Sequence, residues 1–405
     1  MARSLRIVVA SVGWTGHLYP ALALARELRG RGHEMLVETF EERRELVEGL
    51  GLGFAAAAER IAFPGAPAPA GAPSLARAAR ELAPKLRGFR PDLVVADMWT
   101  LTPALAAEVA GIPRATLIPH PYPAHEPGLP FYPLGLQPAR TPLGRAAWRA
   151  LWPAVGTRLP NTRLRAVRAG IDATRAELGL PSLTRYDGQI SERLALVATF
   201  PQLEYPRRWP AGAHVTGPMS FELPQTEIEL PADRPLVLVA ASTERDPEQR
   251  LARVALDALA DEPVRVVVSL NRPGGRWSGP VPANAAVHDW VPYAQVMPRA
   301  AAVVCHGGHG TVARALAEGK PVLVAPRAGD QAENGARVAW AGAGLMLPQR
   351  LLGRGALRAA VRRLLGDPRP GRRAEAIAAW ARTHDGAAAG AELVERAVDG
   401  EAVAA

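Results

Sequence analysis

The sequence contains little cysteine, little lysine and no long apolar run. Its 405 residues include one cysteine, Cys305, so no internal disulfide can form, and a reducing cytoplasmic location is expected. No run of about 18 apolar residues occurs, so a membrane-spanning helix is not expected. The apolar stretch near the start, Ile7–Val12, is short and has no small-residue cleavage site after it. We interpret it as a first buried strand rather than as a signal peptide.

Lysine is scarce as well, although positive charge is not. Lysine occurs only at Lys85 and Lys320, so arginine supplies nearly all of the formal net charge of +9. The arginines are scattered among acidic residues, and no basic stripe with interleaved aromatic residues is present. This pattern indicates a solvated basic surface, and no nucleic-acid partner is expected.

Several motifs of catalytic and nucleotide-binding sites are missing. The sequence has no Walker A motif, no G-x-S-x-G nucleophile elbow and no dinucleotide fingerprint. It has no D-x-D pair that could hold a divalent cation, and His306 and His309 have only one cysteine near them, which disfavours zinc. We therefore expect no metal and no tightly bound cofactor.

What the sequence does contain is a repeated strand–helix pattern. Such β-α-β units predict parallel sheets with helices on their faces, and 405 residues are too many for one hydrophobic core. The prediction is an α/β fold with two Rossmann-like parallel-sheet domains that face a cleft. The predicted parts are an N-terminal domain (1–217), a linker (218–235), a C-terminal domain (236–384) and a helix that crosses back to the first domain (385–405).

The most informative stretch runs from Val303 to Asn334. A predicted strand, Ala300–Cys305, leads into the turn His306-Gly307-Gly308-His309-Gly310-Thr311, and a helical pattern follows. The N-terminus of a helix presents unpaired N–H groups and the positive end of its dipole. Glycines allow a close approach of the backbone to a phosphate. The stretch therefore predicts a diphosphate-binding turn.

Two residues of the N-terminal half predict acid–base chemistry. His17 follows a glycine turn at the end of the first strand, and Asp97 ends another strand of the same predicted sheet. A carboxylate bonded to one imidazole nitrogen fixes the tautomer and stabilises the cation that forms on proton uptake. The alternatives are a capping or solvated role for His17 and a helix N-cap role for Asp97. The sequence favours the pair.

Polar and aromatic residues of the C-terminal half are compatible with ligand binding or with ordinary structure. Ser242 and Thr243 could bind phosphate oxygens or belong to a turn. Trp290 could stack on a flat ring or lie in the core. Asp330 and Gln331 could hold sugar hydroxyls or lie in a surface turn.

Together, these residues resemble a known family. The segments Gly16–Pro20, Asp97, Trp290–Pro292, His306–Thr311 and Gly329–Asn334 are similar to those of nucleotide-sugar-dependent glycosyltransferases of the GT-B fold. More narrowly, they resemble the bacterial UDP-glycosyltransferase-like branch that decorates antibiotics, macrolides and other secondary metabolites. The resemblance covers the full length, and its C-terminal block is the more specific part. It implies inverting, metal-independent transfer from a dTDP- or UDP-sugar to a small aromatic or polyketide-like acceptor.

The resemblance also implies roles for the candidate residues. His17 would deprotonate the acceptor, with Asp97 as its partner, and the N-terminal domain would bind that acceptor. The residues implied for the donor nucleotide and diphosphate are Ser242, Thr243, Trp290, Val291, His306, Gly308, Gly310 and Thr311. Asp330 and Gln331 would hold the donor sugar. The aromatic residues expected at the acceptor pocket are Trp14, Trp99, His120, Phe131 and Tyr132.

The sequence departs from the family pattern at three places. Arg314 stands where plant relatives carry a glutamate that binds both ribose hydroxyls, which fits a dTDP-deoxysugar. His309 occupies a position that is usually small or hydrophobic. The entry Val12–Gly16 resembles peptidoglycan N-acetylglucosaminyltransferases, but Gly329–Gln331 argues against that branch.

Other functions stay open on the sequence alone. One is a transferase acting on a lipid or cell-envelope carrier, for which Phe63 and the pair Phe131-Tyr132 are the only candidate membrane-facing residues. A nucleotide-sugar epimerase and a non-enzymatic sugar-nucleotide-binding protein are the others. The expected partners are a small acceptor and a sugar nucleotide, and the chain is expected to be a monomer or a homodimer.

Overall fold

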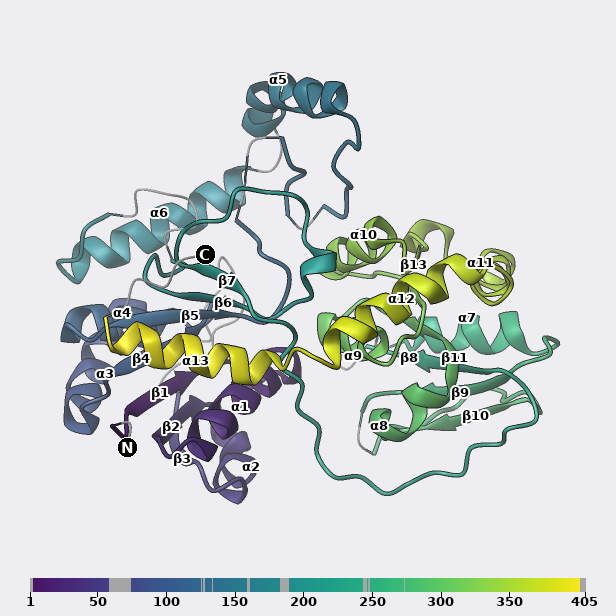
Figure 1. Cartoon of the computed structure of the whole chain (residues 1–405), viewed down its shortest axis with the longest axis horizontal. Coiled ribbons are helices and arrows are strands. Elements are labelled where there is room, and N and C mark those ends of the chain that lie inside the picture. The colour runs from purple at the N-terminus through teal and green to yellow at the C-terminus, as the bar shows by residue number, and fades with distance from the viewer. Residues whose placement is uncertain are drawn as a thin grey trace.

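The computed structural model contains two parallel sheets, each flanked by helices (Figure 1). It describes residues 3–57, 74–124, 126, 128–132, 134–158, 161–182, 189–242, 246, 248–272 and 274–400. The predicted α/β class with two parallel-sheet domains is confirmed. Phe63 and Thr243 lie outside the described residues.

The first sheet is parallel throughout, with the order β3-β2-β1-β4-β5-β6-β7. Its strands are β1 (Arg6–Ala10), β2 (Glu34–Thr39), β3 (Gly53–Ala56), β4 (Leu93–Asp97), β5 (Arg114–Ile118), β6 (Ala195–Val197) and β7 (Ala213–Val215). The chain runs from β1 outward to β3 and then returns to place β4 on the other side of β1. The carboxyl ends of β1 and β4 therefore form the switch point at which ligands bind in open α/β sheets.

The second sheet repeats this plan with the order β10-β9-β8-β11-β12-β13. Its strands are β8 (Leu236–Ala240), β9 (Arg265–Ser269), β10 (Ala285–His288), β11 (Ala300–Cys305), β12 (Val322–Val324) and β13 (Gly344–Met346). The switch point here lies between β8 and β11. Apolar side chains of the central strands are fully buried, since helices cover both faces.

The helices follow the strands in both halves. Those of the first half are α1 (Thr15–Gly30), α2 (Arg44–Gly49), α3 (Leu75–Phe89), α4 (Leu101–Ala110), α5 (Pro142–Arg158) and α6 (Asn161–Glu177), with the short 3-10 turns η1 (Glu41–Arg43) and η2 (Pro201–Leu203). Those of the second half are α7 (Arg250–Leu259), α8 (Tyr293–Val296), α9 (His309–Ala317), α10 (Gln331–Ala341), α11 (Arg354–Gly366) and α12 (Pro368–Ala381), with the turns η3 (Met297–Arg299) and η4 (Gln349–Leu351).

The last helix, α13 (Gly386–Val398), returns to the first half and packs on α1, as the yellow ribbon in Figure 1 shows. Glu395 on α13 accepts hydrogen bonds from Arg31 at 3.1 Å and from His33 at 2.9 Å. Residues 218–235 join the two sheets without a helix or strand. On this basis we propose domain boundaries after residues 217, 235 and 384.

Two helices begin one turn earlier than the sequence predicts. Helix α1 begins at Thr15, within the predicted glycine turn before His17, and α9 begins at His309, within the predicted turn His306–Thr311. Both first turns contain a glycine, which the sequence interpretation assigned to the preceding loop. His17 and His309 therefore lie in helical first turns, with their backbones fixed.

Candidate active site

His17 and Asp97 meet at the first switch point. His17 lies in the first turn of α1, which follows β1, and Asp97 is the last residue of the neighbouring strand β4. Nδ1 of His17 is 2.8 Å from Oδ2 of Asp97, and the Asp97 side chain is fully buried. The sequence predicted this proximity from the positions of the two residues at strand ends.

The surroundings of Asp97 fix the imidazole tautomer of His17. Oδ1 of Asp97 accepts a hydrogen bond from the backbone N–H of Trp99 at 2.8 Å, so both carboxylate oxygens are engaged. Because the carboxylate only accepts, Nδ1 of His17 carries the hydrogen and the lone pair lies on Nε2. This is the arrangement of a general base with an orienting carboxylate.

Aromatic residues predicted for the acceptor pocket gather around His17. The ring centroid of His17 lies 6.4 Å from that of Trp14 and 6.3 Å from that of His120. Tyr132 stacks on His120, and its hydroxyl is 3.2 Å from Nδ1 of His120. Burial lowers the pKa of His120 below its ordinary value, so this imidazole is neutral. Of the other predicted residues, Trp99 and Phe131 are both half-buried.

The glycine turn lies at the second switch point, after β11. Gly307 has φ +92°, and a Cβ at this position would lie 2.6 Å from Cγ1 of Val324, so only glycine fits. His306 donates from Nδ1 to the carbonyl of Ala240 at the end of β8, at 3.3 Å. Burial lowers the pKa of His306, which keeps its imidazole neutral.

Helix α9 presents its N-terminus to the cleft. Gly308 is its N-cap residue, and Gly310 and Thr311 lie in its first turn. A Cβ on Gly310 would meet no protein atom within 4 Å, so there is open space at this N-terminus. The N–H of Thr311 already donates to the carbonyl of Gly308 at 3.1 Å, and its hydroxyl bonds to the Tyr293 side chain.

The predicted sugar-binding residues stand at the start of α10. Asp330 is the N-cap residue, and its Oδ2 accepts from the Asn334 side chain at 3.0 Å. Asn334 also donates to the carbonyl of Gly307 at 2.8 Å, which ties α10 to the glycine turn. Oε1 of Gln331 accepts from the N–H groups of residues 327 and 328 at 2.9 and 3.1 Å. Its NH₂ group is therefore the part that can face a sugar.

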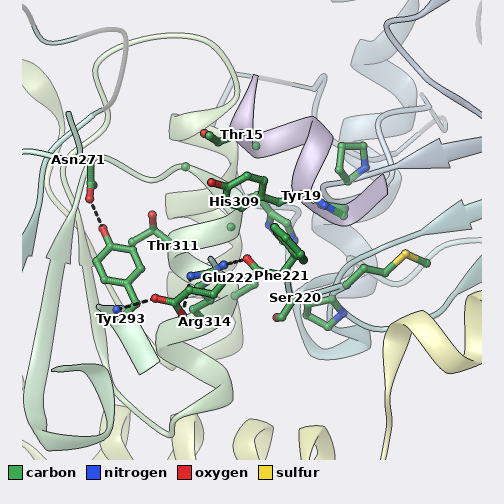
Figure 2. Close-up of a pocket in the computed structure, with 18 of the residues that line it drawn as sticks. Thr15, Tyr19, Ser220, Phe221, Glu222, Asn271, Tyr293, His309, Thr311 and Arg314 are labelled. Carbon is green, nitrogen blue, oxygen red and sulfur yellow. Dashed lines mark hydrogen bonds and ion pairs between the residues drawn. The ribbon is translucent and has the colours of Figure 1, made fainter. Parts of the chain in front are cut away.

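A cavity lies between the two halves of the chain (Figure 2), and its lining does not include His17, Asp97, Asp330 or Gln331. Residues of α1 and of the glycine turn line it together, including Gly16, Tyr19, His306 and Gly310. Among the predicted nucleotide-binding residues, Trp290 lines the cavity, whereas the Val291 side chain is fully buried in the core, so only its backbone can bind a ligand. Ser242 is buried after β8 and is absent from this lining.

The cavity wall also contains residues that sequence interpretation missed. Glu222, from the segment between the sheets, accepts from Arg314 at 3.1 Å and from the N–H of Tyr293 at 2.9 Å (Figure 2). The Tyr293 hydroxyl donates to Asn271 at 2.8 Å. Residues so distant in sequence form no local motif from which these contacts could be predicted. The unusual residue Arg314 was the sequence signal that this part of the cavity differs from the family pattern.

Within the described residues, no group of three or more His, Cys, Asp or Glu side chains is arranged to hold a metal ion. No helix of the described segments is long and apolar enough to cross a membrane.

Comparisons with known proteins identify the family of the chain. The model of the glycosyltransferase family 28 N-terminal domain matches residues 7–116, and that of the erythromycin biosynthesis protein CIII-like C-terminal domain matches residues 253–396. The chain is 30% identical over 395 residues to 4'-demethylrebeccamycin synthase of Lentzea aerocolonigenes, covering 90% of this chain and 92% of that protein.

Solved structures with the same fold include the glycosyltransferase of kitacinnamycin, with a TM-score of 0.74, 24% identity and coverage of 98% of this chain and 100% of that one. Another is VinC in complex with dTDP, with a TM-score of 0.70, 23% identity and coverage of 98% and 100%. The chain therefore belongs to the antibiotic-type nucleotide-sugar glycosyltransferases of the GT-B fold.

Proposed function

We propose that the protein catalyses inverting, metal-independent transfer of a sugar from a dTDP- or UDP-sugar to a small aromatic or polyketide-like acceptor. The observation that carries this proposal is the His17–Asp97 pair on helix α1 and strand β4, because Gly16, next to His17, lines one cavity together with the first turn of α9. One side of the cleft offers a base and the other offers an anion site, as displacement of a diphosphate requires.

His17 acts as the general base. Its Nε2 takes the proton from the acceptor hydroxyl while the acceptor oxygen attacks the anomeric carbon. Attack comes from the face opposite the leaving diphosphate, so the anomeric configuration inverts. Asp97 holds the tautomer and stabilises the imidazolium that forms.

The glycine turn and α9 stabilise the leaving group. Negative charge grows on the diphosphate in the transition state, and the N–H groups at the start of α9 lie where they can receive it. His306 can add a positive charge when it is protonated, because its Nδ1–H is directed to Ala240 and Nε2 then becomes a second donor. Thr311 is proposed as a further ligand, and Ser242 and Thr243 are proposed to act from the end of β8.

The remaining groups define the two substrates. Asp330 and the NH₂ group of Gln331 hold hydroxyls of the donor sugar, and Trp290 stacks on the nucleobase while the Val291 backbone pairs with it. Trp14 and His120 lie beside His17 and Tyr132 stacks on His120, which suits a flat, apolar acceptor, and Trp99 and Phe131 are proposed to contribute to the same pocket. The relative from Lentzea aerocolonigenes, named a rebeccamycin synthase, supports a natural-product acceptor.

The test is donor turnover with a panel of UDP- and dTDP-sugars and a panel of phenolic and polyketide acceptors. The VinC complex is the reason to include thymidine donors. We expect acceptor-dependent release of nucleoside diphosphate that EDTA leaves intact, and a glycoside whose anomeric configuration, read by NMR, is opposite to that of the donor.

Two variants sharpen this test. His17→Ala should lose about 10²–10⁴-fold in kcat, the range of general-base catalysis. His384→Ala serves as control, because this exposed histidine stacks on Trp380 and lies outside the cleft lining. Full turnover by His17→Ala would refute the base, and retention of anomeric configuration would refute direct displacement.

A further inference from the structure

Helix α10 contacts both halves of the site. Its N-terminal end carries Asp330 and is tied to the glycine turn through Asn334. Further along the same helix, Glu333, Ala336 and Arg337 contact residues of the first half of the chain. A helix is rigid over so short a distance, so a displacement at one end is carried to the other.

The contact between the halves is a buried group of three charges. Arg337 donates from Nη1 to Glu204 and from Nε to Glu333, each at 2.9 Å. The three side chains are 2–5% exposed. The Arg337 guanidinium also donates to the carbonyl of Leu203, in the turn η2, and lies 4.2 Å above the Tyr205 ring. The turn η2 lies against α10 in Figure 1.

The irregular segment of residues 119–142 is attached to the same group. The N–H of Gly135 donates to Oε2 of Glu333 at 3.3 Å, and the Gln137 side chain donates to the Ala336 carbonyl at 3.2 Å. Gly135 has φ +68°, and a Cβ there would lie 2.7 Å from Cβ of Ala332. Since only a glycine permits this approach, the segment is fitted to α10 and does not merely lie near it.

The other carboxylate leads to the acceptor side. Oε1 of Glu204 accepts from the N–H of Tyr122 at 2.7 Å, while its Oε2 binds Arg337. Tyr122 comes two residues after His120, whose ring lies 6.3 Å from that of His17. A chain of contacts therefore runs from Asp330, along α10 and through Arg337 and Glu204, to the wall beside His17.

The charges make this contact depend on the arrangement of the two halves. Burial by itself lowers the pKa of Arg337, but Glu204 and Glu333 more than offset this and raise it, so the guanidinium stays charged. If the halves separate, Arg337 keeps Glu333 on its own helix and loses Glu204. A buried charge is costly when its partner is removed. The three charged side chains therefore favour two arrangements. In one, Arg337 contacts Glu204, and in the other the halves are far enough apart for water to take the place of that contact.

We propose that Arg337 is a positioning residue through which donor binding at the start of α10 orders the acceptor-side residues 119–124. This inference rests on the proposed function, because it requires a nucleoside diphosphate to bind at the glycine turn. It predicts thermodynamic coupling between the donor site and a segment of the opposite half.

Hydrogen–deuterium exchange with dTDP or UDP as the probe tests this coupling without a known acceptor. In the wild-type protein, saturating nucleotide should slow exchange in residues 119–124, which Glu204 holds through the Tyr122 N–H, by at least about 5-fold, the lower end of usual coupling factors. In Arg337→Met and in Glu204→Gln the slowing should fall below about 2-fold, while calorimetry shows nucleotide binding retained. Each variant is compared with itself with and without nucleotide, so a general loss of stability does not imitate the effect.

Glu204→Gln keeps the side-chain volume and an acceptor for Tyr122, which protects folding if Arg337→Met is unstable. The matched control is Arg175→Met, since Arg175 is also buried and paired, to Glu108 at 2.8 Å, but within the first half of the chain. It should keep the nucleotide effect.

The outcomes separate the two proposals. Nucleotide that binds the wild type without slowing exchange in residues 119–124 overturns the coupling alone, as does undiminished slowing in both Arg337→Met and Glu204→Gln. If neither dTDP nor UDP binds the folded wild-type protein, the proposed function and the coupling fall together.

Discussion

Replacing Asp97 with asparagine tests the proposed base through its tautomer. In the wild type, the Trp99 N–H donates to Oδ1 of Asp97, and His17 donates to Oδ2. In Asp97→Asn the Trp99 N–H requires an oxygen at the first position, so the new NH₂ group faces His17. Nδ1 of His17 must then accept, and the hydrogen moves to Nε2, the atom that has to take the proton from the acceptor.

The expected loss follows from this change. Nε2 has no lone pair in the forced tautomer, so general-base catalysis is lost although the ring stays in place. This contribution is about 10²–10⁴-fold in kcat, or about 3–5 kcal/mol in activation free energy. His17→Ala and the double variant His17→Ala/Asp97→Asn should show about the same loss, because the two residues act as one unit.

Steady-state release of nucleoside diphosphate measures the effect. The matched control is Asp92→Asn, just before the start of the same strand, where the carboxylate accepts from Arg3 and from the N–H of Arg6 instead. It should keep near wild-type kcat. If Asp97→Asn keeps more than about a tenth of kcat while folding normally, well above the range for a lost base, the tautomer reasoning is wrong.

Three further predictions concern the donor side. Burial lowers the pKa of His306 below its ordinary value, and Nε2 can bind a phosphate only when protonated, because Nδ1–H is held by Ala240. A bound diphosphate raises that pKa, so nucleotide affinity should be greatest at low pH and fall as pH rises from the lowered free value to the raised bound value. Calorimetry should show this slope, and His306→Ala should remove it. Gly310→Ala should leave thermal stability unchanged or slightly raised but weaken nucleotide binding, because its Cβ meets only ligand space. Gly307→Ala should lower the free energy of unfolding by about 1–3 kcal/mol, seen in chemical denaturation, because of its φ of +92° and the clash with Val324. Equal stability of these two glycine variants would contradict that distinction.

The sequence predicted which residues lie close together where each residue follows or ends a strand. His17 and Asp97 each end a strand–turn unit, and parallel strands bring their carboxyl ends to one edge of a sheet. The sequence did not predict contacts that join distant and irregular segments. Glu204 and Arg337 are separated by 133 positions, and neither lies in a recognisable motif. The strands β3 and β7 are hard to predict because they are short, and β3 is only half-buried, which leaves a weak pattern of apolar residues.

Arg314 illustrates the same limit within a recognised motif. Its sequence position suggested that the cavity lacks the acidic group that relatives use at the ribose. The structure shows that Arg314 instead holds Glu222, from the segment between the sheets, against the cavity wall. A carboxylate is therefore present near this place, supplied by a different part of the chain. The arginine alone does not decide between UDP and dTDP donors.

The two switch points use one backbone plan for opposite chemical tasks. In each, a central strand leads to a helix whose second residue is a glycine, Gly16 or Gly310, with no protein atom within 4 Å of its missing Cβ. Each switch point also places a histidine beside its glycine turn. The two histidines differ in the group to which Nδ1 is hydrogen-bonded. Nδ1 of His17 is paired with the carboxylate of Asp97, which in our proposal stabilises the cation and makes the ring a base. Nδ1 of His306 instead donates to the carbonyl of Ala240, and burial outweighs the attraction of Asp330 and Asp246 and lowers the pKa of the ring, so the ring stays neutral until an anion arrives. We therefore propose that the partner of each histidine, rather than the histidine itself, distinguishes the half of the protein that activates the acceptor from the half that receives the leaving group.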